Sequence, residues 1–417
     1  MTNEHTGPLS GLRIIELADE RGRWCGRLLA ELGADVIKIE PPDGSSERDT
    51  APFYHDKPHR ERSLPFWHYN AGKRGITLNL ETKSGCELFR KLVATADVLL
   101  ETNPPGYLPS LKLGPDELRG ADTKLIYCSL TPFGQDGPWR EYETTDLIHM
   151  AGGGQMASSG YDEDELPDAP PIAPGGGNAW HIGSHFALLA ISTALLYRDA
   201  TDEGQYLDVS IHEACALTTE MAVPIYFATH RSVRRQTGRH AAYAMPRPTI
   251  QFRCKDGTYI NAMFNQRLSP QQLRAIAEWL DEYDAADDLL EDRYAEQQVI
   301  NEQQNHISVV LRNFFPKITS EEAYRGYQQR GLAWGAVRTI DDILADPHWE
   351  DRDYWVEIDH PELAASFRYP GAWAIYSESP LAISRRAPLV GEHNAELYGE
   401  LGLGASDLAT LQQDGAI

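Results

Sequence analysis

Residues 12–40 decide the fold. They read Leu12-Arg13-Ile14-Ile15-Glu16-Leu17, then a segment with helically spaced leucines over residues 24–32, then Asp35-Val36-Ile37-Lys38-Ile39-Glu40. Two apolar runs of strand length joined by a helix-length segment are typical of a βαβ unit. The pattern continues, with strands expected at 76–80, 98–100, 125–127 and 205–211 and a helix at 85–96. The sequence therefore predicts an α/β protein whose parallel sheet is covered on both faces.

The pattern changes after about residue 222. Residues 249–263 predict a β-hairpin around Lys255-Asp256-Gly257. Further elements follow in order: helices at 270–283 and 307–315, strands within 354–376, and a mostly helical tail at 394–414. We therefore expect a smaller α+β domain after the large one.

A nearly all-apolar helix is predicted from about His181 to Tyr197, and such a helix must be buried on most sides. Gly175-Gly176-Gly177 leads into it, which fits either an anion-binding helix start or a plain flexible turn. His181 and His185 are four residues apart, a spacing that metals can use. The sequence offers no obvious third ligand, so we predict no metal and a buried or substrate-facing histidine.

Charge and composition exclude several classes of protein. The chain has 38 basic and 62 acidic residues, a net charge of −24, which argues against nucleic acid or an anionic membrane as partner. We expect no membrane-spanning helix and no signal peptide, and the five cysteines are too scattered for a disulfide framework. These features predict a cytoplasmic protein.

The common motifs of nucleotide-binding proteins and of α/β-hydrolases are also missing. The turn after the first strand reads Ala18-Asp19-Glu20-Arg21-Gly22-Arg23, without the glycines of a dinucleotide site. Neither a Walker A motif nor a Gly-x-Ser-x-Gly elbow is present. Arg21 and Arg23 fit two interpretations: they meet a phosphate or carboxylate of a ligand, or they form ion pairs with Asp19 and Glu20.

Segments spread over the chain resemble those of family III CoA-transferases. They are residues 9–17, 29–40, 72–80, 125–129, 133–138, 204–210, 343–347, 391–394 and 400–403. The resemblance implies a Rossmann-like parallel-sheet large domain over 1–222, a small α+β domain over 223–345, and a segment over 346–417 that returns to the large domain. It also implies an interlocked dimer that moves CoA from an acyl-CoA to a carboxylic acid, with no permanently bound cofactor.

The same resemblance suggests which residues contact CoA. Lys73 and Arg74 match a family segment near CoA, Thr102 and Asn103 lie at a strand end near the ligand, and Arg140 matches a basic position after a Gly-Pro turn. Lys38 is a further candidate. Local basic residues are what an acidic protein needs to hold an anionic ligand.

One departure from the family concerns catalysis. The family's nucleophilic aspartate is expected near Ala179 or Trp180, but no carboxylate occurs from Gly175 to Tyr197. Asn178 is able to donate hydrogen bonds to an oxyanion, and His181 is able to move a proton, so both are catalytic candidates. The histidine of racemase relatives is also missing, because its place reads Thr144-Thr145-Asp146.

Three hypotheses remain open. The chain is the subunit of a heteromeric CoA-transferase whose homologous partner supplies the aspartate. It is a stand-alone acyl-CoA enzyme that uses His181 as general acid or base. Or it is a non-catalytic acyl-CoA-binding protein. The first and third require no nucleophile on this chain, and the acyl group is not indicated by the sequence.

Overall fold

The computed structural model describes residues 7–162, 164, 166–219, 221–238, 248–262 and 268–417. Its contacts divide the chain into two compact units. The first unit comprises the chain up to Gly153 together with Pro174–Thr218 and Pro347–Ile417, and the second comprises Gly154–Ala173 and Thr219–Asp346. The chain therefore leaves the first unit twice and returns to it twice.

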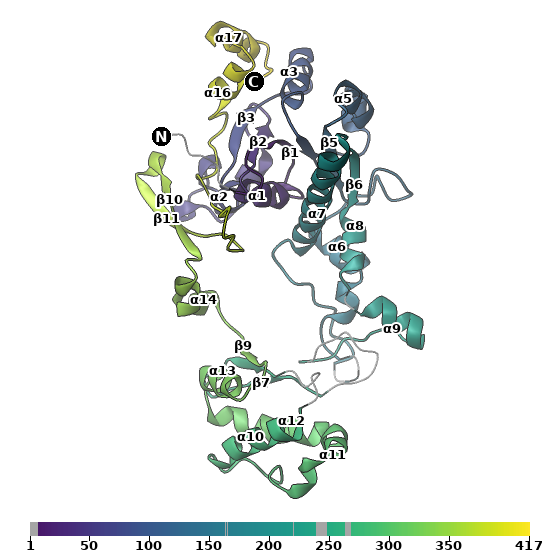
Figure 1. The fold of residues 1–417 in the computed structure, drawn as a ribbon, viewed down its shortest axis with the longest axis vertical. Coiled ribbons are helices and arrows are strands. Elements are labelled where there is room, and N and C mark those ends of the chain that lie inside the picture. The colour runs from purple at the N-terminus through teal and green to yellow at the C-terminus, as the bar shows by residue number, and fades with distance from the viewer. Residues whose placement is uncertain (1–6, 163, 165, 220, 239–247, 263–267) are drawn as a thin grey trace. The chain divides into compact units, whose positions relative to one another are not determined.

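The first unit is built on a six-stranded parallel sheet with the order β3-β2-β1-β4-β5-β6 (Figure 1). Its strands are β1 (Arg13–Leu17), β2 (Asp35–Glu40), β3 (Arg74–Thr77), β4 (Val98–Glu101), β5 (Ile126–Thr131) and β6 (Tyr206–Ser210). This is the order of doubly wound sheets, in which the chain direction across the sheet reverses between β1 and β4. The predicted α/β class is confirmed.

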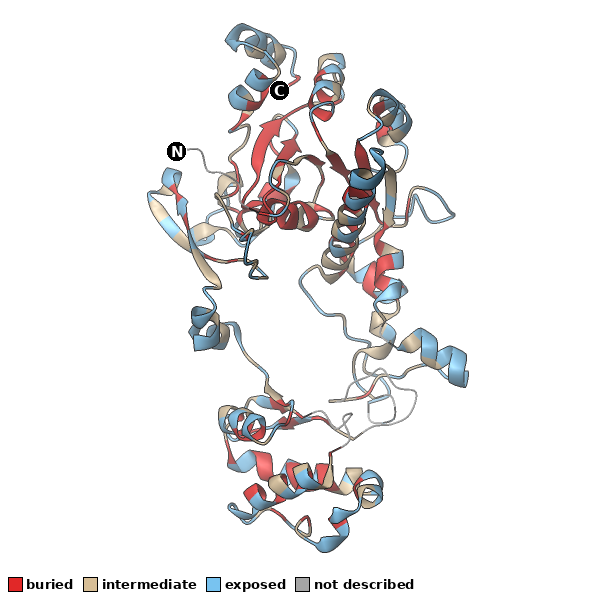
Figure 2. Ribbon diagram, in the orientation of Figure 1, coloured by how far each residue is buried: buried red, intermediate tan, exposed pale blue. Residues whose placement is uncertain are grey.

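Helices cover both faces of this sheet. The main ones are α1 (Arg23–Glu31), α2 (Leu64–Asn70), α3 (Lys83–Val93), α4 (Tyr107–Ser110), α5 (Pro115–Ala121), α6 (Asp146–Gly152), α7 (Asn178–Thr201) and α8 (Ile211–Leu217). Ile15, Ile37 and Leu99 point to the face covered by α3 and the C-terminal helices. The other face carries α1 and α7, which pack against each other and against β2 and β5. The strands β1 to β5 and α1 are largely buried, whereas the edge strand β6 is mostly half-buried (Figure 2).

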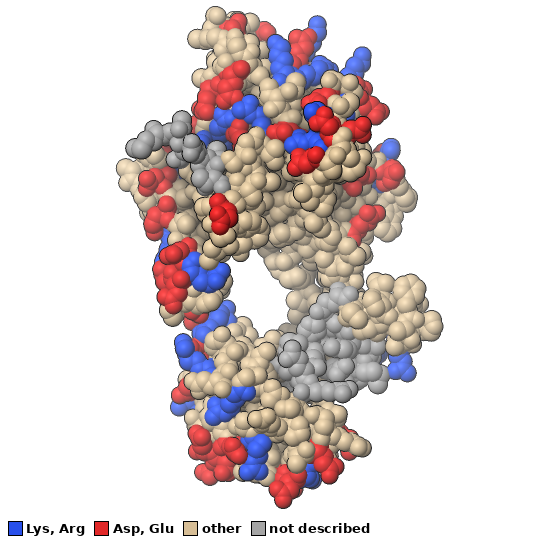
Figure 3. All heavy atoms as spheres, in the orientation of Figure 1, with Lys and Arg blue, Asp and Glu red and all other residues tan. Residues whose placement is uncertain are grey.

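The burial predicted for the apolar helix is wrong for the isolated chain. Helix α7 buries one stripe that includes Ala179, Ala187 and Ile191, but Leu189 is 58% exposed and Leu196 is 70% exposed. By length and composition α7 is able to cross a membrane, contrary to our expectation, although core helices of soluble proteins meet the same criteria. In Figure 3 the surface around α7 carries few charged side chains.

The second unit has a small antiparallel sheet and a helical core. Strands β7 (Gln251–Arg253), β8 (Tyr259–Asn261) and β9 (Gly335–Ala336) form the sheet. The hairpin turn contains Gly257 at φ +83°, as its sequence predicted, while residue 263 lies outside the described residues. The helices are α9 (Ala222–Thr229), α10 (Pro270–Asp281), α11 (Gln297–Glu302), α12 (Gln304–Phe314), α13 (Ser320–Gln329) and α14 (Ile340–Ala345). Trp279, Phe314 and Tyr327 lie in its core.

The C-terminal segment completes the first unit. It comprises α15 (Pro347–Asp351), the antiparallel pair β10 (Trp355–His360) and β11 (Ala365–Pro370), α16 (Asn394–Glu400) and α17 (Ala405–Gln413). His393 Nδ1 accepts a hydrogen bond from the Gly75 N–H, and the Tyr398 hydroxyl donates to the Thr77 carbonyl. These contacts fix the tail against the outer strand β3.

Candidate functional site

A crevice of about 600 Å³ lies at the carboxyl ends of the central strands. Ligands of open α/β sheets bind outside these strand ends, at the point where the strand order reverses. Here that point lies between β1 and β4, and the crevice is lined by the residues that follow Leu17, Ile39, Leu78 and Glu101 in the chain. Topology and cavity therefore indicate the same place as the ligand site.

An ion pair stands on the β1 side of the crevice. The Arg21 Nε–H donates to both Asp19 carboxylate oxygens, at 2.9 and 3.0 Å. The Thr102 hydroxyl donates to Asp19 at 3.0 Å. Burial alone would raise the pKa of Asp19, but Arg21 and Thr102 outweigh it and the pKa is lowered. Arg21 therefore pairs with Asp19, in line with the second of the two sequence interpretations.

Lys38 and Lys73 are fully buried beneath this crevice. The Lys38 ammonium donates to Glu47 at 2.7 Å and to the Ala18 carbonyl at 3.0 Å. The Lys73 ammonium lies 2.7 Å from Glu16 and also donates to the Arg23 carbonyl and to Asn70. Both ammonium groups thus hold the loop after β1 in place, and neither lines the crevice.

The other predicted CoA contacts separate into two groups. Thr102 and Asn103 line the crevice, and the Asn103 backbone N–H and side-chain amide both donate to Glu101. Arg74 instead pairs with Asp35, at the amino end of β2, and with Glu396 and Glu400 of the tail. Arg140 is exposed and pairs with the adjacent Glu141. The structure brings together only the strand-end residues of the predicted set.

The entrance of α7 carries the two predicted catalytic residues. Gly177 precedes the helix with φ +73°, a left-handed conformation that suits glycine. The Asn178 amide donates back to the Gly175 carbonyl at 2.6 Å. His181 Nε2 lies 3.0 Å from the Tyr69 hydroxyl. Burial lowers the pKa of His181, and the nearby His185 and Arg23 lower it further, so the imidazole is neutral at pH 7.

A carboxylate that the sequence analysis did not consider as a neighbour reaches this entrance. Asp146, the first residue of α6, accepts a hydrogen bond at 2.7 Å from the Ala179 N–H. The family aspartate was expected near Ala179 or Trp180, so Asp146 places a carboxylate beside the expected position. Asp146 and Ala179 are 33 positions apart in the sequence. The one sequence signal for Asp146 is that it directly follows Thr145 at the start of a short helix.

A pair of histidines beneath the same entrance was also missed. His149 is fully buried, with Nε2 2.8 Å from the Thr144 hydroxyl and Nδ1 3.2 Å from Nδ1 of His212. Burial and the neighbouring His212 lower the pKa of His149 to about 4, so it is neutral at pH 7. Its ring contacts Trp180. The pair therefore supports the first turn of α7 without adding charge.

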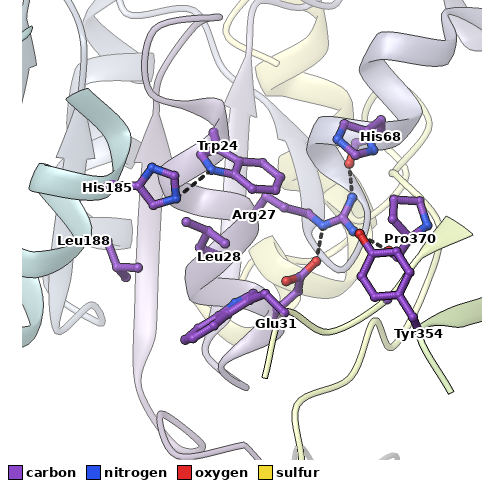
Figure 4. A pocket seen from close by; sticks show the side chains of 11 residues that line it. Trp24, Arg27, Leu28, Glu31, His68, His185, Leu188, Tyr354 and Pro370 are labelled. Atoms are coloured by element: carbon purple, nitrogen blue, oxygen red, sulfur yellow. Dashed lines mark hydrogen bonds and ion pairs between the residues drawn. The ribbon is translucent and has the colours of Figure 1, made fainter. Parts of the chain in front are cut away.

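Next to His181 an apolar pocket of about 310 Å³ opens between α1, α7 and the end of β11 (Figure 4). Trp24 lies on its wall, in ring contact with His68, His181 and His185. Burial, together with Arg27 and His181, lowers the pKa of His68 to about 4. The pocket is therefore lined by apolar and neutral aromatic groups above one buried ion pair, Arg27–Glu31.

His181 and His185 both contact Trp24 and lie on one face of α7. Within the described ranges, no group of three or more His, Cys, Asp or Glu side chains is arranged to hold a metal ion. The α7 entrance therefore offers hydrogen-bonding and acid–base groups, in the same unit that contains the crevice.

A doubly wound sheet with a crevice where its strand order reverses is typical of α/β proteins that bind a ligand there. Comparison with known proteins identifies the family. The chain belongs to CoA-transferase family III, whose family model matches residues 9–394. It is 31% identical over 415 residues to the succinyl-CoA:(R)-benzylsuccinate CoA-transferase subunit BbsE of Thauera aromatica, covering 98% of each chain.

Two further relatives agree with this assignment. The succinate–glutarate CoA-transferase of Agrobacterium fabrum is 30% identical over 400 residues, which is 94% of this chain and 96% of that protein. Among solved structures, a CAIB/BAIF family protein from Brucella suis superposes with a TM-score of 0.80 at 27% identity, covering 95% of this chain and all of that one. The family suggested by the sequence segments is thus confirmed.

Proposed function

We propose that this chain is the non-nucleophilic subunit of a heteromeric CoA-transferase, in which a homologous partner chain supplies the aspartate. The observation that carries the proposal is the start of α7, which reads Gly177-Asn178-Ala179-Trp180-His181 and has no carboxylate of its own near Ala179 or Trp180, where the family resemblance leads us to expect one. The relative from Thauera aromatica, which matches over nearly its whole length, is itself named as a subunit.

The proposed reaction needs no permanently bound cofactor. The partner's aspartate attacks an acyl-CoA thioester and forms a mixed anhydride, releasing CoA thiolate. The thiolate then attacks the aspartyl carbonyl, which gives an aspartyl-CoA thioester and frees the first acid. The carboxylate of the second acid attacks this thioester, which forms a second mixed anhydride and releases CoA thiolate again. The thiolate then attacks the acyl carbonyl of the second acid, which gives the new acyl-CoA and frees the aspartate carboxylate.

In this scheme the chain contributes binding and polar groups. Asn178 and His181 lie near the acyl carbonyl, where an amide N–H and an imidazole stabilise an oxyanion or orient the acid. Thr102 and Asn103 contact CoA directly in the crevice. Lys38 and Lys73 position the loop after β1 from below, because their ammonium groups are enclosed by carboxylates and carbonyls.

We assign no direct CoA contact within this chain's crevice to the two remaining basic residues of the predicted set. Arg74 is engaged by three carboxylates at the other end of β2 and β3, and Arg140 lies on the surface outside the crevice. A role for either residue would have to act on CoA held by a partner chain.

The partner chain also fits the exposed apolar side of α7. Leu189, Leu196 and Tyr197 leave a large apolar surface in water, and such surfaces commonly mark protein interfaces. An interlocked dimer, either with a second copy or with a homologous aspartate-bearing subunit, would cover it. We place the assembly in the cytoplasm, with acyl-CoA and a carboxylic acid as substrates.

Two other functions make distinct predictions. A stand-alone acyl-CoA enzyme would use the neutral His181, which is held by Tyr69, as a general base. A non-catalytic acyl-CoA-binding protein would bind CoA and turn nothing over. Asp146 allows a further test of the stand-alone enzyme, because it places a carboxylate of this chain at the α7 entrance.

The decisive experiment compares the pure chain with a complex formed by co-expression with an aspartate-bearing homologue. With succinyl-CoA as donor, we expect CoA exchange from the complex only, with hydroxylamine trapping the activated aspartyl group on the partner chain. Asp→Asn in the partner is the control and should abolish exchange. Exchange by the pure chain, with the trapped group on Asp146 or another of its own carboxylates, would refute the proposal.

A further inference from the structure

The crevice contains one basic side chain among its described lining residues, and that residue is Arg21. Four acidic residues share the lining: Asp19, Glu40, Glu47 and Glu81. Two of them are neutralised from behind, since Arg48 binds Glu40 at 2.7 Å and Lys38 binds Glu47 at 2.7 Å. Those two cations are fully buried. Among the described lining residues, an anion that enters the crevice therefore has one guanidinium to bind.

The geometry of Arg21 leaves part of its guanidinium available. Nε and Nη2 face the Asp19 carboxylate, while Nη1 makes no hydrogen bond to any residue that the structure describes. The Arg21 side chain is 20% exposed and the Asp19 side chain is 43% exposed. Asp19 is itself fixed, because its Oδ1 accepts from the Arg21 N–H and from the Thr102 hydroxyl. The pair is thus anchored at the strand ends and open to the crevice.

We propose that Arg21 binds a phosphate group of CoA and that Asp19 competes with this phosphate for the guanidinium. The inference rests on the proposed function in assuming that CoA enters this crevice. Guanidinium groups bind phosphates through paired N–H donors, and a protein with net charge −24 needs such a local cation. Asp19 then limits the affinity for CoA, because its negative charge lies beside the bound phosphate.

The competition predicts a gain of affinity from a single substitution. Asp19→Asn keeps an oxygen that accepts from Thr102 and from the Arg21 backbone, but it removes the negative charge and the second carboxylate oxygen that faces Nη2. We expect the Asp19→Asn chain to bind CoA several-fold more tightly than the wild type at low salt. Damage to the loop would instead weaken binding, so the direction of the change is diagnostic.

Isothermal titration of the pure full-length chain with CoA and with pantetheine, which has no phosphate, tests the assignment. Arg21→Ala should weaken CoA binding about tenfold or more and leave pantetheine binding unchanged, and raising the salt concentration should reduce the difference. Arg274→Ala is the charge-matched control, since Arg274 lies in the second unit and pairs with Glu278 on one helix. Arg21→Gln replaces Arg21→Ala if circular dichroism shows that the alanine variant does not fold.

Three results would overturn the inference: no CoA binding by the wild-type chain, equal losses for CoA and pantetheine in the Arg21 variant, or weaker CoA binding by Asp19→Asn. None of them decides the proposed function, which is measured separately as CoA exchange by the complex. Conversely, an inactive complex whose chain shows the expected CoA-binding pattern would refute the subunit role and leave the Arg21 assignment standing.

Discussion

Replacing Arg27 should destabilise the first unit more than any other single change at the apolar pocket. Arg27 and Glu31 form an ion pair on α1 in which the two side chains are 1% and 2% exposed. The guanidinium also donates to the carbonyl of His68, in α2, and to that of Pro370, at the end of β11 (Figure 4). It therefore links α1, an adjacent helix and the C-terminal segment.

The magnitude follows from what each substitution leaves behind. Arg27→Met buries the Glu31 carboxylate without a partner and deprives two carbonyls of their donor, so we expect a loss of about 3–5 kcal/mol in the free energy of unfolding. Glu31→Gln keeps an oxygen for the Arg27 Nε–H and leaves both carbonyl contacts in place. That variant leaves the buried guanidinium without its counter-ion, but three oxygens still accept from it, so we expect a smaller loss of about 1–2 kcal/mol.

The pH dependence has a definite sign. Burial raises the pKa of Glu31 above its ordinary value of 4.5, even though Arg27 acts in the opposite direction. A carboxyl group with a raised pKa in the fold contributes its full stability below the pKa of the unfolded chain and loses it as the pH rises through the folded pKa. The wild type should therefore be more stable relative to Glu31→Gln at acid pH than at neutral pH.

Urea denaturation followed by circular dichroism and tryptophan fluorescence measures these differences, with the pH series run on the wild type and Glu31→Gln. The double variant Arg27→Met/Glu31→Gln should recover part of the loss of the single Arg27 variant, because no unpaired charge remains. A double variant no more stable than Arg27→Met would show that the buried charge is not what makes Arg27 necessary.

Three further outcomes are expected. Asp146→Ala removes the acceptor for the Ala179 N–H and should lower the free energy of unfolding, measured by urea denaturation, by about 1 kcal/mol. Asp146→Asn should lower it by less, and equal losses for the two variants would exclude a capping role for Asp146. Burial lowers the pKa of Lys73 to about 8, so between pH 8 and 10 the unfolded chain binds more protons than the folded one. As the pH rises through this range, the free energy of unfolding of the wild type should increase by on the order of 1–3 kcal/mol relative to Lys73→Met. A difference that does not change with pH would contradict the lowered pKa. His181→Ala should reduce CoA exchange by the complex about a hundredfold without changing the affinity of the chain for CoA; unchanged exchange would remove His181 from the mechanism.

Much of the fold could be predicted because its strands are apolar runs with sharp polar ends. The strand expected at 35–40 has those bounds in the structure, and the other central strands agree within a few residues. The third strand was expected at 76–80 but spans Arg74–Thr77. The pairing of β3 with β2 ends at Thr77, which lies opposite Glu40, the last residue of β2. Leu78 and Leu80 are therefore buried but lie outside the strand. Strand bounds of this kind depend on the partner strand and are not encoded locally.

The candidate site was less predictable, because its geometry depends on contacts between distant segments. Lys73 and Arg74 are adjacent in the sequence, yet one is enclosed below the crevice and the other pairs with Glu396, 322 residues away. Asp146 meets Ala179 only because α6 packs against α7. By contrast, the position of Thr102 and Asn103 at the strand end could be predicted, since the end of a central parallel strand lies at the crevice whatever the rest of the chain does.

Two features of helix α7, its entrance and its exposed apolar side, are explained by the same partner chain. The first turn of α7 has no carboxylate near Ala179 or Trp180, where the family resemblance led us to expect one, and the length of the helix presents Leu189 and Leu196 to water although the sequence is that of a buried helix. A stand-alone acyl-CoA enzyme would need other chemistry at the α7 entrance and a second copy of itself to cover the apolar side. A second copy of this chain would cover the apolar side but would bring no aspartate. A homologous chain that packs along α7 and carries the missing carboxylate supplies both, which is why the heteromer is the arrangement that we favour.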